Sequence, residues 1–214
     1  MPPNGGDKTL LIMRHGETSW NRERRIMGSA DVPLNEAGRS QCEGVARMLA
    51  DFSIDTVVTS PLERARESAQ IIASALGVAL REDSDLEEVK FGRWQGHTYD
   101  EVMRDPDYHF YAADPCGVPT PGGETIVDVQ SRGLAALERA EPGQRTLFVS
   151  HGDIIRSTIC HYLAIPVSEY RRVRVDNCGL TGVLTRAEST EVKFVNMLAD
   201  PKRVWDSLHW GPST

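Results

Sequence analysis

Short apolar runs and longer amphipathic segments alternate along the 214 residues of the chain. Three apolar runs, at residues 9–13, 55–59 and 146–149, contain β-branched residues and are followed by polar or turn-forming residues. Such runs are typical of strands that are buried on both faces of a sheet. Two further strands are predicted at residues 182–185 and 192–196.

Amphipathic segments between these runs predict helices. Asn35 is a candidate N-cap for a helix that reaches about residue 50, since its side chain can accept a hydrogen bond from the first turn. Ser60 as N-cap, followed by Pro61, is typical of a helix start, and Gly77 is typical of a helix end. The apolar residues between them recur at spacings of three and four, which predicts one buried face.

The order of the predicted elements indicates the fold class. With two more helices expected at residues 125–139 and 154–163, strands and helices alternate along most of the chain. This alternation predicts an α/β fold, here a three-layer α/β/α sandwich with a mostly parallel central sheet. The length suits a single domain over residues 1–214, with a flexible N-terminal arm at 1–8 and a C-terminal tail at 199–214.

Residues 104–123 interrupt this alternation. The segment contains four prolines and the aromatic residues Tyr108, Phe110 and Tyr111. Because the predicted elements on both sides belong to one pattern, we expect an insertion over the active site rather than a linker between domains. The alternative is that the aromatic residues only anchor this excursion to the domain.

Composition narrows the class of partner. The formal net charge is −7, which argues against nucleic acid as a partner because phosphate contacts need a basic surface. No apolar stretch approaches the roughly 20 residues of a membrane-spanning helix, and the N-terminus lacks the pattern of a signal peptide. We therefore expect a cytoplasmic protein without a membrane partner. The four cysteines lack C-x-x-C spacing and are expected to be free thiols.

Candidate chemistry follows three of the predicted strands. Arg14 and His15 follow the first run, Arg64 lies in the first turn of the helix after the second, and His151 follows the third. Because parallel strands present their carboxyl ends at one edge of a sheet, we expect these side chains to converge. Two arginines, two imidazoles and a helix N-terminus favour a phosphate or carboxylate ligand. Taken singly, each residue has a plainer interpretation, such as a loop histidine or a solvated helix face.

Six segments stand out, in order, along nearly the whole chain. They are LLIMRHGETSWN (10–21), DVPLNEAGRSQ (31–41), VVTSPLERARESA (57–69), LEEVKFGRWQG (86–96), PGGET (121–125) and FVSHGDIIR (148–156). Through these segments the chain resembles the histidine phosphatase superfamily, in its phosphoglycerate-mutase-like branch, and it is expected to share that fold. A single Arg-His-Gly would be weak, whereas six segments in order, over nearly the whole chain, are a specific match.

The resemblance implies a role for each matched residue. His15 would be the nucleophile that attacks phosphorus and forms a phosphohistidine. Glu88 would protonate the leaving oxygen, with Glu87 as the adjacent alternative. The residues that would bind the phosphoryl group are Arg14, Asn21, Gly28, Arg64 and His151, of which His151 would also be catalytic.

These roles make physical demands on the site. Arginine and imidazolium would neutralise the equatorial oxygens in place of a metal. One ring nitrogen of His15 must be free to attack, so the other must be held by a hydrogen bond, and we expect a backbone carbonyl near Gly16 as its partner. Glu88 must be protonated when it acts. Burial and nearby acids would raise its pKa and the arginines would lower it, and the sequence leaves this balance open.

Three other functions fit parts of the pattern. His15, His151 and Glu88 have the composition of a metal-binding triad, although the adjacent arginines would repel a cation. A non-catalytic binding module would keep the fold and lose the chemistry. A cofactor-dependent phosphoglycerate mutase would share the nucleophile, the arginines and the acid, but residues 104–123 contain no arginine pair for a substrate carboxylate. The resemblance therefore favours a metal-independent phosphomonoester phosphatase without a cofactor, and the mutase is the alternative.

One departure from the family pattern bears on the substrate. Met27 stands where a polar residue is more common, and it would place an apolar surface beside the phosphate. Together with Tyr108, Phe110 and Tyr111 it forms the expected substrate pocket. The expected partner is a small phosphorylated metabolite of open identity, and the protein is a candidate homodimer.

Overall fold

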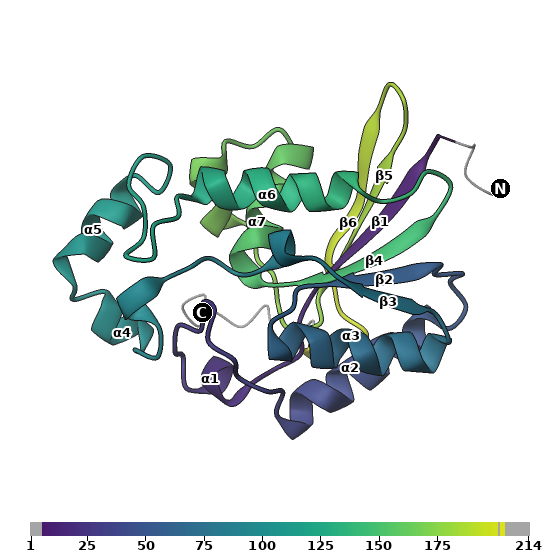
Figure 1. Cartoon of the computed structure of the whole chain (residues 1–214), viewed down its shortest axis with the longest axis horizontal. Helices are drawn as coiled ribbons and strands as arrows, with labels where there is room; N and C mark the ends of the chain where they lie inside the picture. The colour runs from purple at the N-terminus through teal and green to yellow at the C-terminus, as the bar shows by residue number, and fades with distance from the viewer. Residues whose placement is uncertain (1–5, 201, 204–214) are drawn as a thin grey trace.

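A six-stranded sheet forms the centre of the protein, in the order β3–β2–β4–β1–β5–β6 (Figure 1). The computed structural model describes residues 6–200, 202 and 203. The strands are β1 (Lys8–Arg14), β2 (Thr56–Thr59), β3 (Ala79–Glu82), β4 (Arg145–Ser150), β5 (Leu180–Thr185) and β6 (Thr190–Met197). β5 runs antiparallel to its neighbours β1 and β6, and the other pairs are parallel. The predicted, mostly parallel sheet is confirmed.

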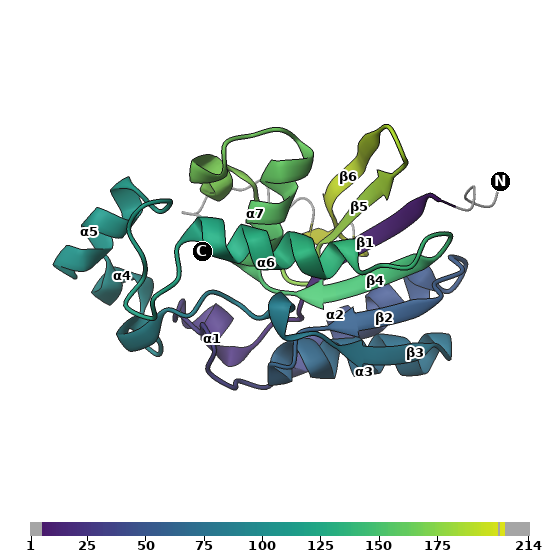
Figure 2. The ribbon, with the colours of Figure 1, turned by 45° about the horizontal axis from the view of Figure 1, so that its top comes forward.

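Helices cover both faces of this sheet (Figure 2). Leu11 and Met13 of β1 contact the apolar cluster of α2 (Glu36–Leu49) and α3 (Glu63–Leu76). Leu10 and Ile12 point to the opposite face, because successive side chains of a strand alternate, and they contact α6 (Ile126–Glu138) and α7 (Gly152–Tyr162). The predicted three-layer α/β/α sandwich is therefore confirmed.

Shorter helices lie in the connections. They are α1 (Ser19–Arg22), α4 (Tyr99–Val102) and α5 (Pro106–Ala113), with 3₁₀ turns at Ser84–Leu86, Gly92–Trp94 and Val167–Arg172. None of the helices in the described part of the chain is long and apolar enough to span a membrane. All four cysteines are free thiols.

Local signals explain where the main helices begin and end. Asn35 caps α2 as predicted, since its Oδ1 accepts a hydrogen bond from the Gly38 amide at 2.8 Å. Gly77 ends α3 in the left-handed conformation, with φ of 68°. The predicted cap at Ser60 is wrong. α3 begins at Glu63 with Leu62 as its N-cap, and the Ser60 Oγ, which accepts from the Leu62 amide at 3.3 Å, also bonds the His151 ring.

Two further boundaries differ from the sequence-based expectations. The N-terminal arm was expected to include residue 8, whereas β1 already begins at Lys8 and pairs with β5 there. Strand β3 was not expected, because its sequence Ala-Leu-Arg-Glu is exposed at the sheet edge and lacks an apolar run. The predicted tail at 199–214 lies mostly outside the described residues.

Residues 104–123 extend away from the sheet with α4 and α5 (Figure 1). Tyr111 of α5 is buried against Trp94, with ring centroids 5.8 Å apart. A small apolar cluster of Ile26, Trp94, Val102 and Tyr111 holds this part of the chain to the domain. The segment therefore has its own anchor, as the alternative interpretation of its aromatic residues expected.

Candidate active site

A cavity of about 40 Å³ lies at the carboxyl ends of the central strands. Arg14 and His15 come from the end of β1, and Arg64 comes from the first turn of α3, which follows β2. The His151 ring, at the end of β4, lies 5.3 Å from the His15 ring. The predicted convergence of these four side chains is thus observed, although they are up to 137 positions apart in sequence (14 to 151).

His15 is held in one orientation at the base of the cavity. It is almost fully buried, and its Nδ1 lies 2.7 Å from the Gly16 carbonyl oxygen. A carbonyl can only accept, so Nδ1 donates and the lone pair of the neutral ring is on Nε2. Burial and then the charges of Arg64 and Arg14 hold the pKa of His15 well below its usual range. The ring is therefore neutral near pH 7, as a nucleophile requires.

His151 is the second buried imidazole of the site. Its Nε2 lies 2.8 Å from the Ser60 Oγ at the end of β2, which ties two strand ends together. Burial, followed by the charge of Arg64 and by His15, lowers the pKa of His151 well below its usual range. Ser60 is a site residue that the sequence pattern missed, because its position suggested a helix cap.

Arg64 is the most deeply enclosed cation of the site. Its Nη2 donates to the Gly28 carbonyl at 2.7 Å and its Nη1 donates to the Ala30 carbonyl at 2.8 Å. Burial lowers the pKa of Arg64 to about 10, which still leaves it charged at neutral pH. Gly28 has φ of 53°, and a Cβ there would lie 2.3 Å from the Gln95 Oε1. In the structure, Gly28 binds Arg64 through its carbonyl oxygen. Direct binding of phosphate by Gly28 stays a prediction.

The polar atoms of the site leave hydrogen-bonding capacity for an anion. Arg14 donates from Nη1 to the Val175 carbonyl at 2.9 Å. Within the described residues, the Nε atoms of Arg14 and Arg64 and the Nδ1 of His151 are buried without a hydrogen-bond partner. The two guanidinium Nε–H groups are donors, and buried donors without partners are costly, so a ligand that accepts from them is stabilised. An oxyanion such as a phosphoryl group supplies such acceptors.

Glu88 is the acid that faces the cavity. Its carboxylate accepts from the Val89 amide at 3.1 Å and from the Asp153 amide, in the first turn of α7, at 3.3 Å. Burial and then the Asp153 carboxylate raise the pKa of Glu88, against the opposing effect of Arg64 and Arg14. The sequence left open whether burial or the nearby arginines would determine the pKa of Glu88, and in the structure the effect of burial is the larger one.

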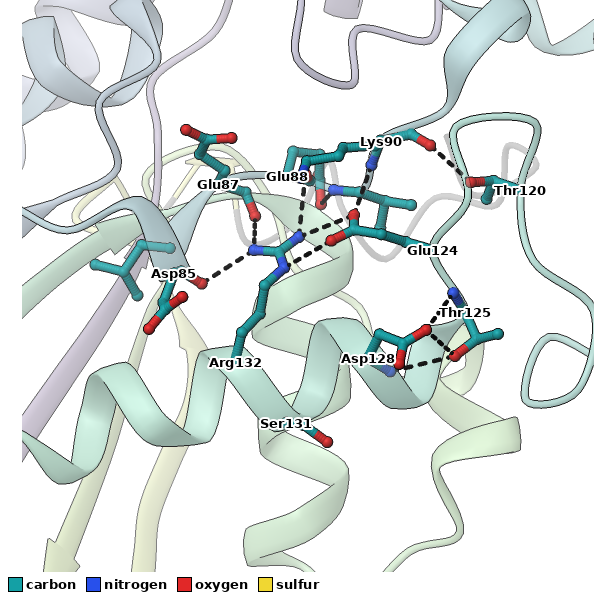
Figure 3. Close-up of polar contacts among 12 residues, drawn as sticks. Asp85, Glu87, Glu88, Lys90, Thr120, Glu124, Thr125, Asp128, Ser131 and Arg132 are labelled. Atoms are coloured by element: carbon teal, nitrogen blue, oxygen red, sulfur yellow. Dashed lines mark hydrogen bonds and ion pairs between the residues drawn. The ribbon is translucent and has the colours of Figure 1, made fainter.

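The neighbouring acid, Glu87, has a different environment. It does not line the cavity, and its side chain points away from that of Glu88 (Figure 3). Of the two adjacent acids, Glu88 is therefore the one with access to a bound ligand.

Asn21 and Met27 line the same cavity. The Asn21 Oδ1 accepts from the Thr18 amide at 3.0 Å and from the Asn177 Nδ2 at 3.2 Å. The side-chain nitrogen of Asn21, Nδ2, is therefore the group left to donate to a ligand. Met27 is 8% exposed, and its Sδ accepts from the Thr18 hydroxyl at 3.3 Å, so an apolar surface does lie beside the cavity.

A second cavity of about 240 Å³ adjoins the first. The two share lining residues, namely Arg24, Ile26, Phe91, Tyr99, Asp153 and Arg156. Tyr108 and Tyr111 line the second cavity, whereas Phe110 is 66% exposed and lines neither, so its predicted place in the substrate pocket is wrong. Tyr108 and Tyr111 lie on the side of helix α5 that faces the second cavity, and Phe110 lies on its exposed side. The 104–123 segment thus forms a side wall of the second cavity rather than a cover over the first.

The metal-site alternative has little support in the arrangement of side chains. No group of three or more His, Cys, Asp or Glu residues suited to a metal ion occurs in residues 6–200, 202 and 203. The guanidinium groups of Arg14 and Arg64, whose charges act on His15, would also repel a divalent cation. The expectation that the protein needs no cofactor stays a prediction.

Comparison with known proteins agrees with this geometry. Residues 10–198 match the family model of the histidine phosphatase superfamily (branch 1). A phosphoglycerate mutase-like protein 4 from Arabidopsis thaliana is 41% identical over 156 residues, which are 69% of this chain and 68% of that protein.

Two solved structures share the fold over most of their length. Phosphoserine phosphatase from Entamoeba histolytica, in complex with 3-phosphoglyceric acid, gives a TM-score of 0.80 at 28% identity and covers 89% of this chain and 97% of its own. A mycobacterial glucosyl-3-phosphoglycerate phosphatase, in complex with VO3, gives 0.78 at 27% identity and covers 88% and 98%. With the family match over nearly its whole length, the chain belongs to branch 1 of the histidine phosphatase superfamily.

Proposed function

We propose that the protein is a metal-independent phosphatase that hydrolyses a small phosphomonoester through a phosphohistidine at His15. The observation that carries this proposal is the His15 ring, fixed through Nδ1 in a cavity that also contains Arg14, the fully buried Arg64 and the Glu88 carboxyl, with the pKa of His15 lowered and that of Glu88 raised. Nucleophile, anion-binding groups and proton donor are the three parts that phosphoryl transfer without a metal needs.

In the first step, the Nε2 of His15 attacks phosphorus in line with the ester oxygen. A phosphorus–nitrogen bond forms and the phosphorus–oxygen bond to the alcohol breaks. Glu88 gives its proton to the leaving oxygen, so the alcohol departs neutral and Glu88 becomes a carboxylate. Arg14 and Arg64 stabilise the charge on the equatorial oxygens.

In the second step, a water molecule takes the place of the alcohol. Glu88 removes a proton from this water while the oxygen attacks phosphorus and the bond to His15 breaks. Inorganic phosphate is released, His15 regains its lone pair, and Glu88 is protonated again. Each group returns to its starting state, so no cofactor is consumed.

The alcohol part of the substrate is proposed to occupy the second cavity. The first cavity has about 40 Å³ and is lined by the phosphate-binding groups, whereas its neighbour has about 240 Å³ and a more apolar wall. Tyr108 and Tyr111 supply aromatic surface there, and Met27 lies near the junction. This supports a substrate whose alcohol part includes a ring or another extended group.

The mutase alternative has the support of the mutase-like relative from Arabidopsis thaliana and of one feature of the structure. Arginines do line the second cavity, although Arg24, Arg156 and Arg171 come from outside residues 104–123. Arg156 pairs with Asp153 at 2.8 Å, and Arg171 stacks on Tyr111 at 5.2 Å. With these two engaged inside the protein, a substrate carboxylate has fewer available partners, which favours hydrolysis over mutase chemistry.

We expect phosphate release from a panel of phosphomonoesters to be unchanged by EDTA and to exceed the interconversion of 3-phosphoglycerate and 2-phosphoglycerate. The physical reason is that charge neutralisation comes from arginines and that water has access to the phosphoenzyme. Colorimetric phosphate release and a coupled mutase assay measure the two rates. Activity that EDTA abolishes and a divalent ion restores would contradict the proposal, and so would a dominant mutase rate.

The role of the second cavity gives a separate prediction. Tyr108→Ala is expected to raise KM for aryl or nucleoside phosphates by about 2- to 10-fold, because an aromatic contact contributes about 0.5–1.5 kcal/mol. KM for glycerol phosphate should change little. Phe110→Ala is the matched control, since this ring lies two positions away and is exposed. Equal effects of both variants would remove the second cavity from substrate binding.

A further inference from the structure

The PGGET motif has no part in the cavity, yet it lies directly behind the catalytic acid. Glu124 of this motif and Arg132 of α6 form an ion pair with 3.0 Å between Nε and Oε1. The Arg132 side chain is only 17% exposed and that of Glu124 only 13%. Neither lines the active-site cavity. Residues 85–90, called the acid segment below, run beside this pair (Figure 3), and Glu88 of this segment lines the cavity.

Arg132 binds the backbone of the acid segment rather than its carboxylates. Its Nη1 donates to the carbonyls of Asp85, at 3.0 Å, and Glu87. Its Nη2 donates to the Glu88 carbonyl at 3.1 Å. One rigid guanidinium thus fixes three carbonyl groups, including the one in the peptide that joins Glu87 to Glu88 and the one that follows it.

Glu124 extends the same contact past Glu88. Its Oε2 accepts from the Lys90 amide at 2.9 Å while the carboxylate holds Arg132 through both oxygens. The ion pair therefore binds the acid segment on either side of Glu88, through carbonyls before it and an amide after it.

Glycines let the motif approach the acid segment closely. A Cβ on Gly122 would lie 1.9 Å from the Lys90 carbonyl oxygen, and a Cβ on Gly92 would lie 2.6 Å from the Gly122 amide nitrogen. The Thr120 hydroxyl donates to the same Lys90 carbonyl at 2.6 Å. The two backbones are in direct contact, which only glycine permits at these positions.

We propose that the Arg132–Glu124 pair is a positioning device that fixes which carboxyl, Glu88 or Glu87, faces the phosphoryl group. The inference rests on the proposed role of Glu88 as the acid. Glu87 has an extended backbone, with φ of −62° and ψ of 153°, and adjacent side chains in extended chain point to opposite sides. A shift by one residue would exchange the two acids, and a shift of about 1 Å would misalign the proton donor.

The test is the dependence of kcat/KM on the leaving group in Arg132→Met. An alkyl phosphate needs a proton from Glu88, whereas 2,4-dinitrophenyl phosphate has a leaving group that departs without one. We expect a loss of about 100-fold for the alkyl ester and of less than about 3-fold for the aryl ester. The parameter kcat/KM is chosen because it reports the first step alone.

Arg139→Met is the matched control at the end of the same helix, where Arg139 is the C-cap of α6. Arg139 binds the carboxylates of Asp83 and Asp85, and among the described residues it makes no hydrogen bond to the backbone at 87–90. Arg139→Met should leave kcat/KM unchanged for both substrates. Where Arg132→Met does not fold, Glu124→Gln decides, because it keeps the size of the side chain and loses the charge. It should show a smaller loss with the same preference for the alkyl ester.

Glu88→Gln separates this inference from the function on which it rests. If Glu88→Gln itself lowers kcat/KM equally for the alkyl and the aryl ester, the proposed role of Glu88 is wrong. If Glu88→Gln lowers kcat/KM mainly for the alkyl ester but Arg132→Met lowers it equally for both esters, the positioning role is overturned. The inference also requires that Arg132→Met in the Glu88→Gln background causes little further loss, because its effect acts through Glu88.

Discussion

His15→Ala is expected to lower kcat/KM by about 10⁴-fold or more and to abolish the phosphoenzyme, because a nucleophile cannot be replaced by its neighbours. The geometry of the site supports this size of effect. His15 is the ring whose Nδ1 is held by the Gly16 carbonyl, whereas His151 bonds Ser60 through Nε2. His15 directly follows Arg14 at the end of β1, the strand that lies between β4 and β5 in the sheet.

The measurement is acid-labile, base-stable label on the protein after a quenched turnover of ³²P-substrate. His161→Ala is the control, since this histidine is exposed in the last turn of α7. Folding of His15→Ala is checked by thermal unfolding with and without inorganic phosphate, which the remaining arginines should still bind. Label on His15→Ala, or turnover close to that of the unchanged protein, would assign the nucleophile elsewhere.

The layers of the fold were predictable because periodicity reports burial. The apolar runs at 9–13 and 146–149 predicted strands that do lie at the centre of the sheet, buried on both faces. β3 was not predictable in this way, since an edge strand with exposed side chains has no apolar run. The start of α3 was misplaced because Ser60 has the chemistry of a helix cap but bonds His151, a residue 91 positions away.

The site was predictable only where its residues follow strands. Arg14, His15 and His151 satisfy that rule, and the strand ends bring them together. Asp153 and Arg132 could not be assigned a role from sequence. The effect of Asp153 on the pKa of Glu88 and the hold of Arg132 on the backbone of the acid segment both depend on packing between elements distant in sequence. Phe110 was misassigned because a short helix exposes one side, and composition does not reveal which.

Glu88→Gln is expected to lower kcat/KM for alkyl phosphates by about 10²- to 10⁴-fold and to remove the alkaline decline of the pH profile. The raised pKa of Glu88 keeps its carboxyl protonated to higher pH than an exposed glutamate. The protonated fraction, and with it kcat/KM, falls as pH rises through that pKa. Glutamine has no ionisation, so the variant should show no such decline. The ratio of the two enzymes on one substrate cancels the ionisation of the substrate itself.

The raised pKa of Glu88 also predicts that Glu88→Gln, which lowers activity, increases stability. Since the folded protein binds the Glu88 proton more tightly than the unfolded chain, its free energy of unfolding decreases as pH rises from the ordinary glutamate pKa, about 4.3, through the raised one. Glu88→Gln avoids this loss, so it should have a higher Tm than the unchanged protein at pH 8, and the difference should shrink at pH 4. An inactive variant that is more stable would show that burial of the acid serves catalysis at the expense of stability. A lower Tm at pH 8 would instead mean that the Val89 and Asp153 amides need the charged carboxylate, and that burial is not what sets the pKa.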